Sequence, residues 1–184
     1  LDGGVNWENA TLGYDDGSPF ISRLANHKNL PDKLYTVGSS GVWISDDFGG
    51  SWRLNPIPEQ WGFNSSIDIE VSKADYNTIY TGGFLSEESR IFVSKDGGLS
   101  FEASGNYLKQ EMGFISGIGT QPDDPATAYA LFSFAGKPKV LKTSDYGQTW
   151  VDISGFQGNN GISDRGFPDV AIQSLLVFPN YTNR

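Results

Sequence analysis

Hydrophobic and polar residues alternate along this chain in short runs, and turn-forming residues separate the runs. The run Ile67-Asp68-Ile69-Glu70-Val71 is clear because every second residue is apolar. A period of two places the apolar side chains on one face of a β-strand, whereas an amphipathic helix repeats every 3.6 residues. Windows of about twelve residues show no convincing helical period. The pattern therefore predicts an all-β protein.

A short motif recurs along the chain at a nearly constant spacing. The pattern Ser/Thr-x-Asp-x-Gly-x-Ser/Thr/Asn-Trp/Phe is found, the first time in part, at 2–7, 45–52, 94–101 and 143–150. Its closing aromatic residues are Trp7, Trp52, Phe101 and Trp150, at intervals of 45, 49 and 49 residues. The tyrosines at 35, 80 and 129 form a second frame, at intervals of 45 and 49. Two frames with one period indicate an internal repeat.

Each repeat unit contains four predicted strands. They cover about 66–72, 78–82, 90–94 and 101–103 in one unit, and about 115–120, 127–133, 138–143 and 150–153 in the next. Four strands in about 45–50 residues is the size of a β-propeller blade. We therefore expect a β-propeller built from four-stranded antiparallel blades.

The octapeptides resemble the Asp-box, or BNR repeat. This family of β-propellers includes sialidases, xyloglucanase-type glycoside hydrolases, sortilin-type receptors and secreted bacterial BNR-repeat proteins. The resemblance covers almost the whole chain, and it implies that each box lies in the hairpin between the third and fourth strands of a blade. The motif is specific for the fold and says little about activity.

The repeat also predicts how the chain is divided within a single, incomplete propeller segment over 1–184. Residues 1–19 would end a preceding blade, and 171–184 would supply the first strand of the next. Between them we expect blades with their connections at 20–65, 66–114 and 115–170. About three blades are fewer than the four to eight that close a propeller. The remaining blades of the same propeller, or another chain, are thus expected partners.

The box residues have a structural explanation. The aspartates can accept backbone N–H groups within their own turn, the glycines suit a positive φ, and the aromatic rings can pack between blades. These residues are Asp2, Asp47, Gly49, Trp52, Asp96, Gly98, Phe101, Asp145, Gly147 and Trp150. A role for the aspartates as calcium ligands or catalysts is the alternative. Nearly identical sites at the same blade position favour the structural role.

The candidate ligand site is the loop in which the chain departs from the repeat. The connection after Trp150 is eight residues longer than its equivalents and includes 155–169. The family resemblance implies that such connections form the ligand face. Candidate ligand-binding residues are Phe156, Asp164, Arg165 and Phe167 in this loop, with Trp61 and Tyr107 in the preceding connections. We expect these loops to line one rim, where aromatic rings would stack on a glycan or peptide; the alternative is that the rings fill gaps between blades.

No catalytic set is identifiable in this segment. A xyloglucanase-type hydrolase would use two carboxylates on separate blades, and Asp68 and Asp169 are weak candidates for such a pair. The Phe/Tyr-Arg-Ile-Pro motif of sialidases is absent. Whether the chain belongs to an enzyme therefore stays open.

Composition narrows the remaining possibilities. A net charge of −9 and a pI of about 4.4 argue against nucleic-acid binding. The chain has no cysteine, no apolar run long enough to span a membrane, and one histidine, His27, which we expect to be solvated in a polar turn. We expect no cofactor and no metal.

Together these features predict a segment of a secreted or cell-surface Asp-box propeller, bacterial by its Cys-free, Asn/Gly/Ser-rich composition. It would act as a glycan- or protein-binding or scaffold module of a larger protein, with carbohydrate or an extracellular protein as partner. Two alternatives remain: a glycoside hydrolase, either xyloglucanase-like or sialidase-like, and a sortilin-like receptor propeller for peptides.

Overall fold

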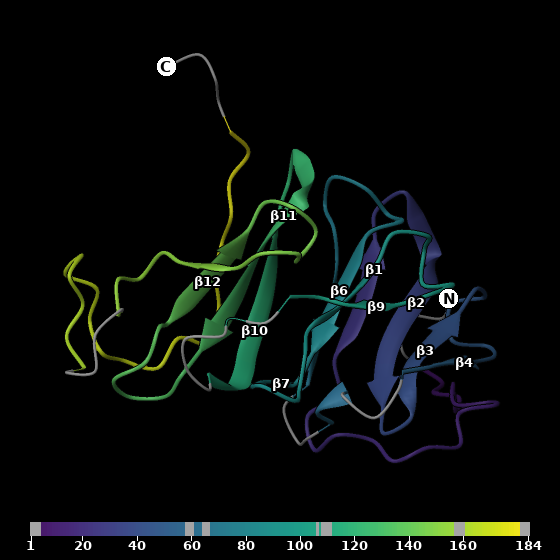
Figure 1. Cartoon of the computed structure of the whole chain (residues 1–184). Coiled ribbons are helices and arrows are strands. Elements are labelled where there is room, and N and C mark those ends of the chain that lie inside the picture. The colour runs from purple at the N-terminus through teal and green to yellow at the C-terminus, as the bar shows by residue number, and fades with distance from the viewer. Residues whose placement is uncertain are drawn as a thin grey trace.

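The computed structural model describes residues 5–57, 61–63, 67–105, 107, 112–156 and 161–180. Antiparallel strands dominate these residues, and they form three sheets placed side by side (Figure 1). Within the described ranges, no helix has the length and apolar character that crossing a membrane requires. The predicted all-β class is confirmed.

The first sheet has the strand order β1-β2-β3-β4, which is also the order along the chain. Its strands are β1 (Leu24–His27), β2 (Leu30–Gly38), β3 (Gly41–Ser45) and β4 (Arg53–Pro56). Tyr35 in β2 pairs with Ala25 on one side and with Ile44 on the other. This up-and-down order is that of a propeller blade.

The next two sheets repeat this arrangement. The second has the order β5 (Asp68–Val71), β6 (Ile79–Gly82), β8 (Phe92–Ser94) and β9 (Glu102–Ala103). The third contains β10 (Gly113–Gln121), β11 (Asp124–Phe132), β12 (Val140–Thr143) and β13 (Val151–Asp152). The short β7 (Phe84–Leu85) pairs with the start of β10, so that it joins the second blade to the third. The observed strands lie where the repeat predicts them, with ends that differ by a few residues.

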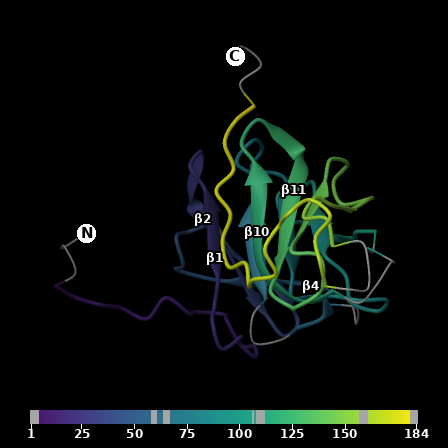
Figure 2. The ribbon, with the colours of Figure 1, turned by 90° about the vertical axis from the view of Figure 1, so that its left-hand side faces the viewer.

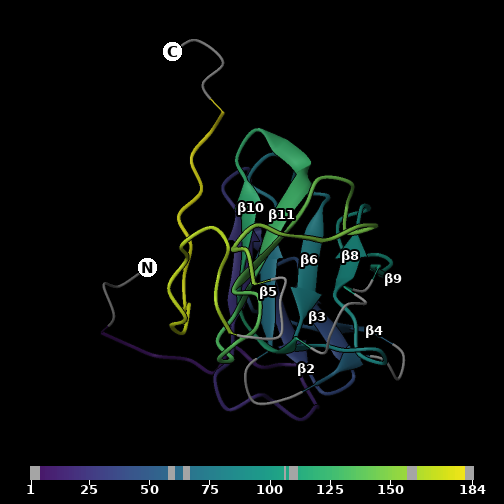
Figure 3. The same cartoon turned by 60° about the vertical axis from the view of Figure 1, so that its left-hand side comes forward.

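The first strands of the three blades lie next to one another. β5 contacts both β1 and β10, and Figure 3 shows β5 beside β10. The sheets therefore meet along their first strands, as blades do around a propeller axis. The predicted fold, an incomplete propeller of four-stranded blades, is confirmed.

Alternating side chains fill the spaces between blades. Val37 and Ile44 of the first blade pack with Ile69 and Ile79 of the second in one buried cluster. The tyrosine frame reinforces this packing, because the Tyr35 hydroxyl donates a hydrogen bond to the Gly97 carbonyl oxygen, 3.1 Å away in the next blade. The Tyr80 hydroxyl likewise reaches the carbonyl oxygen of Pro125, at 2.8 Å.

His27 is buried, so the expectation that it is solvated is wrong. Its Nδ1 accepts a hydrogen bond from the backbone N–H of Asn29 at 3.1 Å, and its Nε2 lies 3.3 Å from the carbonyl oxygen of Lys73. The imidazole thus joins the turn after β1 to the connection after β5. The polar local sequence does not reveal this contact because its partner is distant in the chain.

The segment 171–180 runs beside the first strand of the third blade (Figure 2). Ser116 Oγ and Ser133 Oγ donate to the Ile172 carbonyl oxygen, and Gln121 Nε2 donates to that of Phe178 at 3.0 Å. No strand is assigned within 171–180. The assignment of this segment to a further blade stays a prediction.

Candidate functional site

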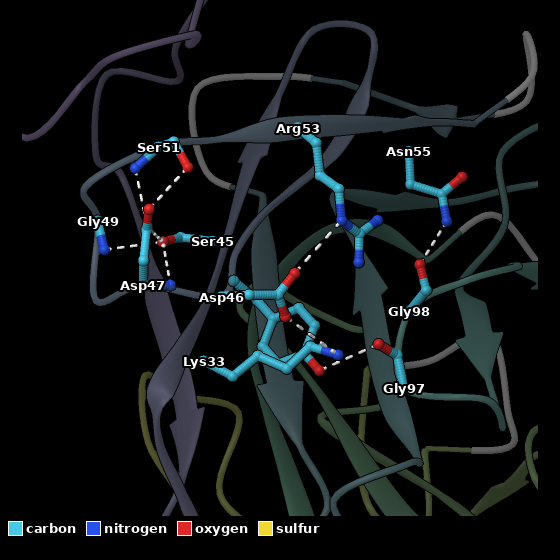
Figure 4. Close-up of polar contacts among 11 residues, drawn as sticks. Lys33, Ser45, Asp46, Asp47, Gly49, Ser51, Arg53, Asn55, Gly97 and Gly98 are labelled. Carbon is cyan, nitrogen blue, oxygen red and sulfur yellow. Dashed lines mark hydrogen bonds and ion pairs between the residues drawn. The ribbon is translucent and has the colours of Figure 1, made fainter.

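The repeated octapeptides form tight turns between the third and fourth strands of each blade. In the first blade, the backbone N–H of Gly49 donates to Ser45 Oγ at 2.8 Å, and Ser45 Oγ donates to Asp47 Oδ1 at 2.7 Å (Figure 4). The other end of the turn is held by the Ser51 backbone N–H, which lies 2.8 Å from Asp47 Oδ1. One carboxylate therefore organises the whole turn.

The other two blades repeat this geometry. The N–H groups of Gly98 and Gly147 each donate, at 2.9 Å, to the hydroxyls of Ser94 and Thr143. These hydroxyls are buried, whereas Asp47 and Asp96 are exposed and Asp145 is half-buried. Hydrogen bonds from the Ser51 side chain and backbone hold the pKa of Asp47 below its usual value.

The carboxylates in these turns bond to groups of their own turn. The described residues hold no group of three or more metal-ligating side chains. Gly98 has φ +86°, and a Cβ there would lie 2.9 Å from a methyl group of Ile44. The turn glycine is thus required by both conformation and packing. Asp2 lies outside the described residues.

The aromatic residues that close the motif pack onto the preceding part of the chain. Trp52 Nε1 donates to the carbonyl oxygen of Ala10 at 2.7 Å, and Trp150 Nε1 lies 3.4 Å from Ser104 Oγ in the second blade. Phe101 packs against the cluster between the first two blades. These contacts agree with the predicted packing between blades.

Three of the predicted ligand-binding aromatics are buried. The exposed fractions of Trp61, Tyr107 and Phe156 are 3%, 8% and 1%. Trp61 donates from Nε1 to the Gly38 carbonyl oxygen at 3.1 Å, and its ring meets Phe92 edge-on at 5.8 Å. The prediction that these rings lie open for stacking is therefore wrong, because neighbouring elements cover them.

The long connection is fastened to the third blade. Ser163 Oγ donates to the carbonyl oxygen of Ser154 at 2.6 Å and accepts the backbone N–H of Phe167 at 3.0 Å. The side chains of Asp164 and Arg165 are exposed, and Phe167 is half-buried. Residues 157–160 of this loop lie outside the described residues. The loop therefore offers polar groups to solvent, but its predicted role in binding stays a prediction.

Asp169 anchors the same loop by a charged contact. Its Oδ1 lies 2.6 Å from Lys139 Nζ, and the backbone N–H of Gly136 donates to both carboxylate oxygens at 3.0–3.1 Å. The Lys139 side chain is completely buried, and its ammonium group lies 5.3 Å from the centre of the Phe156 ring. The hydrogen bond from Lys139 is the largest cause that lowers the pKa of Asp169, and the bond from the Gly136 N–H lowers it further. A buried cation thus uses Asp169 as its counter-ion.

Asp68 is held in a different place, at the junction of the three blades. Its Oδ1 lies 3.6 Å from Arg23 Nε, and its Oδ2 accepts the backbone N–H of Ile118 at 2.8 Å. Burial raises the pKa of Asp68, although the Ile118 N–H and the Arg23 guanidinium oppose this. Asp68 lines a groove of about 280 Å³ whose lining does not include Asp169. Among the described contacts, the two carboxylates share no partner.

An exposed aromatic cluster was missed by the sequence analysis. Phe114 lies between Phe84, at 5.0 Å between ring centres and edge-on, and Phe134, at 5.9 Å and nearly parallel. Phe114 and Phe134 are 45% and 41% exposed. The pairing of Phe84 with Phe114 joins β7 to β10, whereas Phe134 lies in the connection between β11 and β12. We call these three rings the phenylalanine cluster.

The phenylalanine cluster lies at the end of the blades opposite the repeat turns. Gly113 precedes its central ring with φ +87°, and a Cβ at Gly113 would come within 2.5 Å of the Phe134 ring. Lys137 Nζ lies 5.8 Å from the centre of that ring. Flat apolar faces beside a cation are suited to stacking against sugar rings or other partly apolar ligands.

Comparison with known proteins supports the fold. No family model matches this chain. It is 26% identical over 143 residues to a xyloglucanase from Hypocrea jecorina (strain QM6a), covering 76% of the chain and 16% of the xyloglucanase. The fold is that of a β-propeller segment.

Two solved structures have a similar fold. A GH74 enzyme from Niastella koreensis matches with a TM-score of 0.56 and 17% identity, covering 71% of this chain and 22% of the enzyme. An ancestral GH74 enzyme matches with a TM-score of 0.52 and 17% identity, covering 76% of this chain and 19% of that one. The chain therefore spans about a fifth of the length of the proteins it resembles.

Proposed function

We propose that this chain is part of a secreted Asp-box propeller and binds neutral glycan chains through the phenylalanine cluster. The closely spaced rings of Phe114 and Phe134, which are exposed, and of Phe84, which is half-buried, carry this proposal. The sequence similarity to a xyloglucanase supports a glycan as the ligand. Sugar rings present C–H faces that stack on aromatic rings, and such contacts need no catalytic group.

The proposal also covers the larger protein. The turns described above support membership of the Asp-box family, and the division of the chain into blades at 20–65, 66–114 and 115–170 follows from it. The remaining blades, a bacterial source and export to the cell surface belong to this same proposal. In the proposed site, Asp164, Arg165 and Phe167 are additional polar and aromatic contacts contributed by the long loop.

Substitution of the central ring tests the proposed site. Phe114→Ala should weaken binding of a xyloglucan oligosaccharide about tenfold, because one stacking contact is worth about 1.4 kcal/mol. Isothermal titration calorimetry gives the affinity, and Phe20→Ala is the matched control because Phe20 is exposed and lies outside the cluster. Unchanged affinity of Phe114→Ala, with the fold intact by circular dichroism, would exclude the cluster as the site.

Hydrolysis of a glycan is a second candidate function, and the similarity to a xyloglucanase favours it. The separate settings of Asp68 and Asp169 favour binding over catalysis, because a glycosidase needs two carboxyl groups flanking one bond. Release of reducing sugar from xyloglucan, abolished by Asp68→Asn or Asp169→Asn, would replace the binding function with an enzymatic one.

A further inference from the structure

Two adjoining cavities lie along β5, away from the phenylalanine cluster. Their volumes are about 280 and 320 Å³, and both are lined by Glu70 and Lys73. The first also contains Arg23 and Asp68, whereas the second contains His27 and Lys28. Because the two cavities share Glu70 and Lys73, they form one extended site with charged side chains along it.

Positive charge gathers at this site in a protein that is acidic overall. The chain has 13 basic residues and a net charge of −9, yet three of the basic residues, Arg23, Lys28 and Lys73, line these cavities. Lys28 and Lys73 have exposed side chains with no ion pair to a described residue. Such a concentration of cations attracts an anion.

Asp68 cancels only the part of this attraction that comes from Arg23. Its charge is already compensated by Arg23 and by the backbone N–H groups of Ile69 and Ile118, at 3.0 and 2.8 Å. Arg23 uses Nε for this ion pair, and its side chain remains 47% exposed. The guanidinium therefore has donors left for a ligand, since it carries five N–H groups.

Glu70 is the acidic group that faces the cavities without such compensation. It lies two residues from Asp68, on the same face of β5, and its half-buried carboxyl group has no hydrogen bond or ion pair with any described residue. Burial raises the pKa of Glu70 to about 7. The positive charge of Lys73 lowers this pKa, and the negative charge of Asp68 raises it further. Near neutral pH, Glu70 is therefore protonated in a large fraction of molecules.

The charged and titratable side chains around Glu70 come from two strands and their flanking residues. Arg23, His27 and Lys28 face the cavities from β1 and its flanking residues, and Asp68 and Lys73 do so from β5 and the residues after it. β10 and the segment 173–175 contribute no titratable side chain to the lining. No other described acid lines the site.

We propose that these cavities bind the carboxylate of an acidic saccharide, and that the site takes this ligand only when Glu70 carries a proton. Ionised Glu70 would repel the ligand carboxylate, whereas protonated Glu70 can donate a hydrogen bond to it. Lys28 and Lys73 supply the attraction, and Arg23, whose charge is paired with Asp68, supplies hydrogen-bond donors. This site is separate from the phenylalanine cluster, so its failure and the failure of the proposed glycan site can be told apart.

The size of the pH effect follows from the fraction of molecules in which Glu70 is protonated. With a pKa of about 7, Glu70 is almost fully protonated at about pH 5.5 and only about 3% protonated at about pH 8.5. Apparent affinity scales with the competent fraction, so the dissociation constant should rise about 30-fold between these pH values. A sugar carboxylate stays ionised throughout this range.

Calorimetry with trigalacturonate tests the proposal, and the neutral trisaccharide of galactose is the comparison ligand. We expect the 30-fold pH effect with wild-type protein and no binding of the neutral sugar at this site. Glu70→Gln should lose most of the pH effect, because its side chain is neutral throughout. Lys73→Met should lower the affinity about tenfold at about pH 5.5 and by less at about pH 8.5, because the loss of Lys73 also favours protonated Glu70. Lys142→Met, outside the site, should match wild type.

Several results would overturn the proposal. These are absence of trigalacturonate binding, a wild-type affinity that does not change with pH, a pH effect of the same size in Glu70→Gln, or equal losses in Lys73→Met and Lys142→Met. Sodium sulfate that competes as strongly as the sugar acid would show a general anion site instead. Phe114→Ala should leave trigalacturonate binding unchanged while it weakens binding of the neutral xyloglucan oligosaccharide.

Discussion

The repeat turn offers a quantitative test of how these blades are stabilised. In the second blade, the Ser94 hydroxyl is buried, accepts the Gly98 N–H at 2.9 Å and donates to Asp96 Oδ1 at 2.8 Å. Ser94→Ala would leave the buried Gly98 N–H without an acceptor. We expect this change to lower the free energy of unfolding by about 1–3 kcal/mol, the cost of an unsatisfied buried polar group.

Asp96→Ala removes more hydrogen bonds but should cost less. Asp96 accepts the backbone N–H groups of Leu99 and Ser100, both at 2.9 Å, and the Ser100 hydroxyl at 2.6 Å. The Leu99 and Ser100 groups are exposed, so water can replace their lost acceptor. The buried Ser94 hydroxyl also loses Asp96 Oδ1, but it keeps the Gly98 N–H as a partner. We therefore expect Asp96→Ala to lower the free energy of unfolding by about 1 kcal/mol. The loss of a buried aspartate would cost more.

Urea denaturation at neutral pH, followed by circular dichroism, measures both changes. In thermal denaturation, each kcal/mol lost from the free energy of unfolding should lower the melting temperature by about 2–4 °C in a chain of this size. Ser100→Ala is the matched control, because it deletes an exposed hydroxyl from the same turn. If Asp96→Ala cost clearly more than Ser94→Ala, or removed ligand binding without changing stability, the structural interpretation of the turn would be refuted.

The pH dependence of the same variant adds an independent check. Burial is the largest single influence and raises the pKa of Asp96, but the hydrogen bonds together, beginning with that from the Ser100 side chain, outweigh it and lower the pKa. A group with a lowered folded pKa stabilises the protein above its unfolded pKa of about 3.9, and this contribution is lost in more acidic solution. The stability difference between wild type and Asp96→Ala should therefore shrink below about pH 4.

Two further predictions concern anchoring contacts. Asp169→Asn should lower the melting temperature more than Lys139→Met, because it leaves a buried ammonium group without its counter-ion, whereas methionine needs none; the reverse order in thermal denaturation would contradict this. Asp16 accepts hydrogen bonds from Ser39 and Trp43, which lower its pKa to about 2 against the effect of partial burial. Asp16→Ala should thus destabilise the protein at neutral pH and shift Trp43 fluorescence, with the stability difference from wild type lost as pH falls from about 4 through about 2.

The local pattern was sufficient for the architecture. Alternation such as that around Ile69 places apolar side chains on one face, and the recurring Asp-x-Gly turn determines where each hairpin reverses. Both signals arise from neighbours in the chain, so they can be recognised without knowing what packs where. The repeat then gave the blade size, and the strands were found at the predicted places.

The site depended on contacts between distant segments, which no local pattern encodes. Trp61 and Phe114 both lie in or beside connections between blades, yet other elements cover Trp61 while Phe114 stays exposed beside Phe84 and Phe134. In the same way, Asp68 and Asp169 looked alike in sequence, but the fold gave one an arginine at the blade junction and the other a buried lysine. Period and turn chemistry thus determined the scaffold, whereas burial and charge pairing, which depend on the packing of whole blades, were decided only by the tertiary structure.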